Sequence, residues 1–198
     1  MTNREILNVT YTQYLGALGD WLRKAAAGLG DTQADALLST RLAPDMFPLA
    51  TQVRFVCVQA IEGMHRIRGE QLPELVTELL DEGRSGGEAP GTIGEALARI
   101  DQTLALIESL GAGPGNEDGS RPVAHELPMG LVFDMTQDQY LRDWALPQFY
   151  FHLVTAYAIL RSGGVALGKL DYVSHIFGFV RPGTMPPGMG QESRTGAD

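Results

Sequence analysis

The sequence lacks the features that mark several classes of protein. It has one cysteine, Cys57, among 198 residues, so no disulfide can form within a single chain. No uninterrupted apolar run approaches the roughly 20 residues that a membrane-spanning helix needs. The amino terminus, MTNREILNVT, also lacks the basic start and apolar run of a signal peptide. We therefore expect a cytoplasmic protein with no membrane-inserted segment, in which Cys57 is a small buried apolar residue.

Positive charge is scarce as well. The formal net charge is -9 and the isoelectric point lies near 4.9. Nucleic acids and anionic membrane surfaces would both repel such a chain, so we expect neither as a partner. The acidity also favours solubility, which explains the charge without invoking any partner.

Local motifs that carry chemistry are also missing. The chain has no nucleophile elbow, paired-cysteine motif or dinucleotide fingerprint, and GGVALGK has Leu170 where a phosphate loop needs Ser or Thr. Its four histidines are too few and too scattered for a closed structural zinc site. Glu62 and His65 have the Glu-x-x-His spacing of helical metal sites. Because arginines flank them near a helix end, we expect both side chains to be exposed.

Apolar residues recur at steps of three and four in four long segments, which is the pattern of amphipathic helices. The first begins at Thr2, with Glu5 at the capping-box spacing, and ends near Gly30. The third begins with the same spacing between Thr92 and Glu95.

Proline marks the start of the other two long helices. The second extends from Pro48 to about Arg68, and the fourth from Pro147 to about Ser162. Between the first three helices we expect a short helical turn at residues 31–40, a short helix at 72–80, and an exposed loop at 81–91.

These elements predict an all-α protein, a four-helix bundle with a short irregular or hairpin insert before the fourth long helix. The insert spans residues 111–136, in which PVAHELPMGLVFDMT has hairpin character, and residues 138–144 are predicted to be helical. We expect one helical-bundle domain over residues 1–180. Residues 181–198, rich in proline and glycine, are predicted to be a flexible tail.

The segment from Phe149 to Val173 is the most informative, because it places His152 inside an apolar, aromatic-rich helix. A buried imidazole needs a hydrogen-bonding partner, and the simplest interpretation is a structural histidine. A functional imidazole could instead face a ligand and act as a base. The expected partners on facing elements are Asp45 and Gln52. Asp45 could alternatively cap the second helix.

Two blocks of sequence resemble a known family. The segments RLAPDMFPLATQV, residues 41–53, and FYFHLVTAYAILRSGGVALGKLDY, residues 149–172, are similar to a bacterial family of unknown function that is grouped with the DinB/YfiT-like proposed metalloenzymes. The helix order is compatible over residues 4–175. The resemblance implies an up-down-down-up four-helix bundle that is often a homodimer. In the wider superfamily, three histidines from the second and fourth long helices bind a divalent metal. Some members use that metal to activate a small thiol for transfer or isomerisation.

The chain departs from this pattern at the metal ligands. His152 matches one position of the fourth-helix pair, but its neighbour four residues later is Ala156, and Gln52 stands where a second-helix histidine is expected. The resemblance then implies a pocket of Asp45, Gln52, His152 and Tyr157 that binds a small molecule without metal.

Three hypotheses stay open. The first is a small-molecule-binding DinB-like bundle, either a simple binder or an enzyme with a degenerate or absent metal site, in which His152 is the candidate catalytic residue. The second is a non-enzymatic dimeric module whose aromatic face includes Trp144, Phe149 and Phe151. The third is a divalent-metal-dependent transferase or isomerase, with the metal held by His152 and oxygen donors such as Asp45. The ligand, the reaction and the cofactor are not determined by the sequence.

Overall fold

The computed structural model describes residues 1–112 and 118–185, and these are mostly helical with one two-stranded sheet. The expectation of an all-α chain thus holds for the long elements, with a hairpin added. The elements are α1 (Asn3–Leu29), α2 (Asp31–Leu37), α3 (Leu49–Arg68), α4 (Glu74–Ser85), α5 (Ile93–Gly111), β1 (Pro122–Glu126), β2 (Val132–Thr136), α6 (Gln137–Gln139), η1 (Tyr140–Ala145), α7 (Leu146–Ser162), α8 (Lys169–Tyr172) and η2 (Ser174–Phe179).

Reciprocal hydrogen bonds fix the starts of α1 and α5, as the sequence predicted. The Thr2 hydroxyl accepts from the Glu5 backbone N–H at 3.2 Å, and the Glu5 carboxylate accepts from the Thr2 N–H at 2.9 Å. Thr92 and Glu95 repeat both bonds at 3.1 and 2.8 Å. Each box satisfies donors that the first helical turn leaves without a partner.

The predicted bounds of α3 are confirmed. Pro48 precedes its first residue, and Gly69 follows its last with φ +72°, a left-handed conformation that costs glycine little. These two residues therefore define where α3 begins and where it ends.

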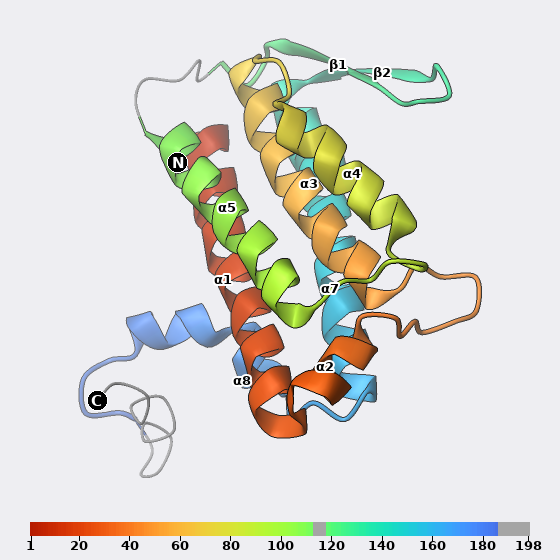
Figure 1. Cartoon of the computed structure of the whole chain (residues 1–198). Helices are drawn as coiled ribbons and strands as arrows, with labels where there is room; N and C mark the ends of the chain where they lie inside the picture. Colours follow the sequence, from red (N-terminus) through yellow and green to blue (C-terminus); the bar gives the residue numbers. More distant parts are fainter. Residues whose placement is uncertain (113–117, 186–198) are drawn as a thin grey trace.

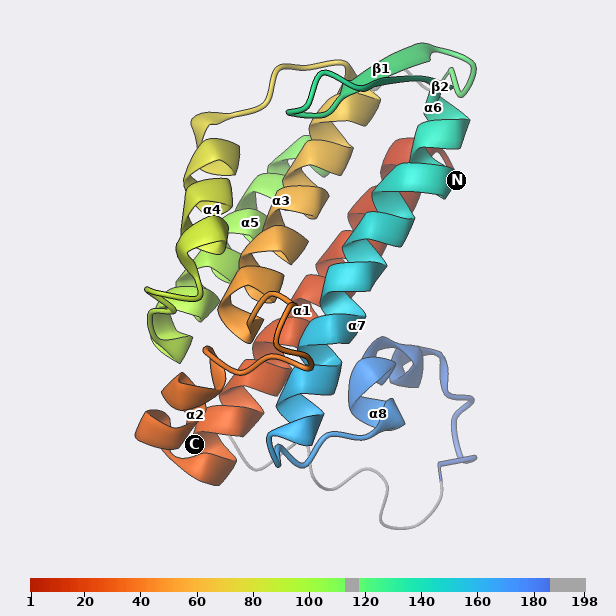
Figure 2. The same ribbon diagram turned by 90° about the vertical axis from the view of Figure 1, so that its right-hand side faces the viewer.

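Four long helices lie side by side (Figures 1 and 2). Helix α1 contacts α3, α5 and α7, while α3 also contacts α5, α7 and the shorter α4. The hairpin lies across the end of the molecule where α3 finishes, and α2 lies near the opposite end (Figure 1). Helix α3 is thus enclosed by other helices.

Helix α4 is longer than predicted. The sequence indicated a helix over residues 72–80 and an exposed loop over 81–91, but α4 continues to Ser85. The reason is tertiary: the Thr51 hydroxyl of α3 donates to the Gly83 carbonyl at 2.7 Å, and Gly83 is buried against α3. Packing therefore holds a glycine-containing turn helical where local propensity alone would not.

The insert contains the predicted hairpin. Strands β1 and β2 pair antiparallel, with His125 opposite Phe133, and β1 buries Val123 and His125 on one face. A continuous helical run follows, in which residues 140–145 are π-helical and the Leu146 N–H bonds to the Leu141 carbonyl. Pro147 lies in the first turn of α7, which extends from Leu146 to Ser162, so the predicted bounds of the fourth long helix are confirmed.

The core is one cluster that joins all the long helices and includes Trp21, Tyr140 and Phe149. Cys57 lies within it, as expected, and burial raises the pKa of its thiol to about 11. The thiol therefore stays protonated and unreactive near neutral pH. No helix in the two described ranges is long and apolar enough to cross a membrane.

The segment after α7 is tied to α1. The Trp21 indole N–H donates to the Asp171 carbonyl at 3.1 Å, and Lys24 pairs with the Asp171 carboxylate at 3.0 Å. Of the predicted tail, residues 186–198 lie outside the described residues. The domain limit at residue 180 stays a prediction.

Because α1 and α3 approach closely at Gly63, adding one methyl group at this position should clearly lower the stability of the protein. The Tyr11 hydroxyl lies so near Gly63 that a Cβ there would overlap it, and Tyr11 is fully buried. We expect Gly63→Ala to lower the free energy of unfolding by about 1–3 kcal/mol, the usual range for overpacking a core. Urea denaturation followed by circular dichroism measures it.

Gly16→Ala is the matched control, because a Cβ at Gly16 in α1 meets nothing within 4 Å. There the substitution should leave stability unchanged or raise it by up to about 1 kcal/mol, as alanine favours helix interiors. Equal effects at the two positions would contradict the packing that we describe.

Candidate functional site

His152 and Gln52 form a buried polar pair between α7 and α3. The Nδ1 atom of His152 lies 2.9 Å from the Oε1 atom of Gln52, and the Gln52 Nε2 atom donates to the Phe47 carbonyl at 3.2 Å. The second bond fixes the amide, since the reverse orientation would place two carbonyl oxygens against each other. Nδ1 therefore carries the proton and donates to Oε1, and Nε2 keeps its lone pair.

Burial keeps this imidazole neutral. The His152 side chain is about nine-tenths buried, and loss of solvation lowers its pKa to about 4. Nε2 has no hydrogen-bond partner in the described part of the chain, although it is not among the fully buried unpaired atoms. It is thus an open hydrogen-bond acceptor at the edge of the core.

Aromatic rings surround the imidazole. Phe55 and Phe151 each meet it edge-on, with ring centroids 5.3 and 5.2 Å away, and Phe47 packs on Phe55. Phe47 and Phe151 are more than half exposed. The acceptor nitrogen therefore lies beside an apolar surface that water reaches.

The other two predicted pocket residues lie elsewhere. Asp45 is exposed in the linker before α3 and makes no hydrogen bond or ion pair with any residue that the structure describes. It does not cap α3 either, because Pro48 holds that position. Tyr157 packs on Trp21 at 5.2 Å, since five residues along α7 turn it about 140° away from His152. Of the four expected residues, the structure brings only Gln52 and His152 together.

Glu62 and His65, expected at the surface, are largely covered. His65 is buried, and the Glu62 carboxylate lies 3.7 Å from the His125 Nδ1 atom and 3.4 Å from Arg66. The hairpin lies over this end of α3, so residues that an isolated helix would expose face β1. Loss of solvation lowers the pKa values of His65 and His125.

The metal hypothesis depends on ligands beyond His152. Within residues 1–112 and 118–185, no group of three His, Cys, Asp or Glu side chains lies close enough to hold a metal ion. Asp45, the proposed oxygen donor, is exposed on the linker. The described residues therefore do not fit a divalent metal at His152, and we derive no chemistry through one.

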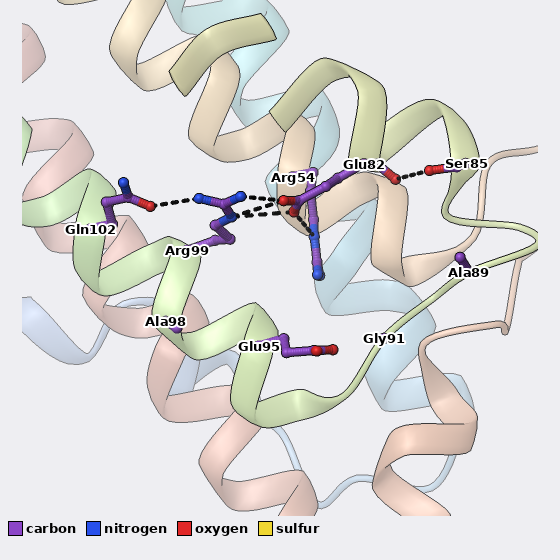
Figure 3. Close-up of a pocket in the computed structure, with 9 residues that line it drawn as sticks. All are labelled: Arg54, Glu82, Ser85, Ala89, Gly91, Glu95, Ala98, Arg99 and Gln102. Atoms are coloured by element: carbon purple, nitrogen blue, oxygen red, sulfur yellow. Dashed lines mark hydrogen bonds and ion pairs between the residues drawn. The ribbon is translucent and has the colours of Figure 1, made fainter. Parts of the chain in front are cut away.

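A charged cavity of about 560 Å³, which was not predicted from the sequence, lies between α3, α4 and α5 (Figure 3). Arg54, Glu82 and Arg99 lie along its wall, and each of the two arginines forms an ion pair with Glu82. One signal was present in the sequence, because Arg54 interrupts the apolar run of the second helix, in VRFVCV. A cation in such a run needs a buried partner.

The protein is mostly helical and has a DinB-like fold. A crystal structure of a DinB family member protein from Shewanella denitrificans is similar over 90% of this chain and 93% of that chain, with 28% identity and a TM-score of 0.66. The chain belongs to the family described as Domain of unknown function (DUF1993), which matches residues 5–173. The predicted family resemblance is confirmed. None of the curated proteins compared with the chain matches it.

The low pKa of His152 predicts a loss of stability in acid. Between pH 6.5, the ordinary value, and about 4, the unfolded chain binds a proton at this residue that the folded protein does not. The free energy of unfolding therefore falls as the pH drops through this window. The total decrease is roughly 3 kcal/mol, because one pKa unit corresponds to about 1.4 kcal/mol. Urea titrations at several pH values measure it.

His152→Asn removes the titrating group and should flatten the curve over the same window, even if it lowers stability at pH 7. His65 and His125 titrate in both proteins, so the difference between the two curves belongs to His152. Curves of equal slope would show that the imidazole is solvated in the folded protein.

Proposed function

We propose that this chain binds a small neutral molecule at the open nitrogen of His152. The observation that carries the proposal is the fixed tautomer: Gln52 accepts from Nδ1, which leaves the Nε2 lone pair without a protein partner. The pair lies between α3 and α7, the second and fourth long helices, which are the helices that the family resemblance implies for binding. The direction of the chain through α1, α3, α5 and α7 supports an up-down-down-up bundle (Figure 1).

The low pKa defines which ligand this nitrogen favours. A group with a pKa near 4 is neutral at pH 7 and is a weak base. Protonating it would place a charge in the core without a carboxylate to pair with. His152 is therefore suited to accept a hydrogen bond from an O–H or N–H group while Phe47 and Phe151 contact the apolar part. A cytoplasmic location stays a prediction.

Phenol and toluene test this site, because they are close in size and only phenol donates a hydrogen bond. Phenol should bind about tenfold more tightly than toluene, the difference expected of one buried hydrogen bond. Ligand-observed NMR titration measures both affinities.

In His152→Ala the preference for phenol should disappear while weak apolar binding of both probes remains. Circular dichroism of this variant establishes that it is folded. Equal affinity of the wild-type protein for phenol and toluene, or no binding of either, would mean that His152 is purely structural.

Self-association is a second candidate function, and one observation favours it. Phe151 and Val154 are 58% and 46% exposed and lie three residues apart, on one face of α7. The other residues expected at this interface are not available: Phe149 is fully buried, and Trp144 packs on His125 at 4.4 Å. A homodimer interface on this face would therefore be centred on Phe151 and Val154.

Light scattering tests the dimer. We expect the wild-type protein to have the mass of two chains and Phe151→Glu the mass of one, because an unpaired carboxylate resists burial. Val9→Glu, at an exposed apolar position of α1, should leave the mass unchanged. A wild-type monomer at high concentration would remove this candidate and leave the small-molecule site untouched.

A further inference from the structure

A second site lies apart from His152, in the cavity between α3, α4 and α5. Its volume of about 560 Å³ is within the range of about 300–1,000 Å³ that is usual for small-molecule pockets. Three helices and the loop before α5 build its walls. The polar side chains that line it are those of Arg54, Glu82, Ser85, Glu95, Arg99 and Gln102.

Arg54 is the unusual member, because it is a buried cation with unused donors. It is 5% exposed, and its Nε atom donates to Glu82 at 3.3 Å. Its Nη1 atom is fully buried and has no hydrogen-bond partner among the described residues, and its Nη2 atom, which is not fully buried, also makes no hydrogen bond to them and lies beside Gly91 of the cavity wall. Figure 3 shows the end of this guanidinium projecting between Glu82 and Glu95. Guanidinium N–H groups without an acceptor are costly in a largely buried side chain, so the cavity is suited to a ligand oxygen that accepts from Nη2.

The charged residues next to Arg54, which are Glu82 and Arg99, already have ionic partners within the protein. Glu82 accepts from the Arg99 Nε atom at 3.0 Å as well as from Arg54. Burial alone would raise the pKa of Glu82, but the hydrogen bonds and charges of the two arginines outweigh it and lower the pKa. Arg99 also bonds to the Gln102 amide oxygen at 2.8 Å and pairs with Glu78 at 3.2 Å. Neither Glu82 nor Arg99 is left to neutralise a ligand.

Glu95 supplies the complementary group. Its Oε2 atom accepts from the Thr92 N–H in the helix cap, whereas its Oε1 atom has no hydrogen bond to any described residue. In Figure 3 the Glu95 carboxylate lies across the space below the Arg54 guanidinium. The cavity thus presents one free cationic donor and one free anionic acceptor to the same volume.

We propose that this cavity binds a small zwitterion of the amino-acid type, with its carboxylate on Arg54 and its ammonium on Glu95. Charge balance favours this class. The four ionised residues of the lining, Arg54 and Arg99 against Glu82 and Glu95, sum to zero. A simple anion would place negative charge beside Glu95, and a simple cation would leave the Nη donors of Arg54 without an acceptor. A zwitterion satisfies both groups without adding net charge.

Isothermal titration calorimetry with defined probes tests the ligand class. Glycine, L-serine, L-leucine and L-phenylalanine carry both charges, whereas acetate and ethylamine carry one each. At least one amino acid should bind with a dissociation constant below about 10 mM, and acetate and ethylamine should bind at least about tenfold more weakly, the effect of one lost charge-assisted hydrogen bond.

Two matched variants locate the binding. Ala98 lines the cavity on the exposed side of α5, and Ala105 is exposed on the same helix away from it. Ala98→Met should weaken binding of the amino acid by about tenfold or more by filling the cavity, while Ala105→Met should leave it within about twofold. Arg54→Lys keeps the charge but loses the second donor, and should weaken binding by a similar factor if the variant is folded.

The results that overturn the proposal are distinct. Acetate binding as tightly as the amino acids would make this a simple anion site. No binding of any amino acid would show that water alone satisfies Arg54, and unchanged binding in Ala98→Met would place the ligand elsewhere. His152→Ala should bind the amino acid normally, so failure here and failure of the His152 site are separable.

Discussion

Helix α3 has no face that is free of other elements: α1, α4, α5 and α7 pack against it, and the hairpin lies over its end. Its polar side chains therefore have to find partners on neighbouring helices. Thr51 donates to the Gly83 carbonyl of α4, Gln52 bonds to His152 of α7, and Arg54 pairs with Glu82 of α4. Because burying a polar group without a partner is costly, these three contacts fix how α4 and α7 lie on α3.

Both candidate sites follow from this enclosure, and each contains polar atoms that the protein leaves without a partner. Gln52 uses its two amide atoms on Phe47 and on Nδ1 of His152, so Nε2 of the imidazole is left over. Glu82 accepts from both Arg54 and Arg99, and Arg54 bonds to it only through Nε, so the two Nη atoms of Arg54 have no partner among the described residues. One site therefore offers an acceptor beside aromatic rings, and the other a donor among compensating charges. The two suit ligands of different kinds and lie on different sides of α3.

Near the C-terminal end of α3, a polar side chain again lies beside a residue of a neighbouring element. Glu62 lies near His125 of the hairpin, and the π-helical segment places Tyr140 and Trp144 around that ring. π-Helical turns lie at functional sites in many proteins. Here the turn has a packing role, since it directs two large aromatic side chains onto the strand that covers Glu62. The insert is thus part of the core as well as a connection.

The sequence by itself determined the features that depend on near neighbours. The capping boxes at Thr2 and Thr92, the proline start of α3 and the hairpin were all predicted, because a cap or a turn needs only residues three or four apart. The position of His152 inside an apolar helix indicated that it would be buried, and Gln52 was one of its two expected partners. Only the tertiary structure decided their pairing, since they are 100 residues apart. It also separated Tyr157 from His152, left Asp45 in solvent and joined Arg54, Glu82 and Arg99 around a cavity. These outcomes depend on how whole helices are rotated against one another, and that rotation is set by the packing of the entire core.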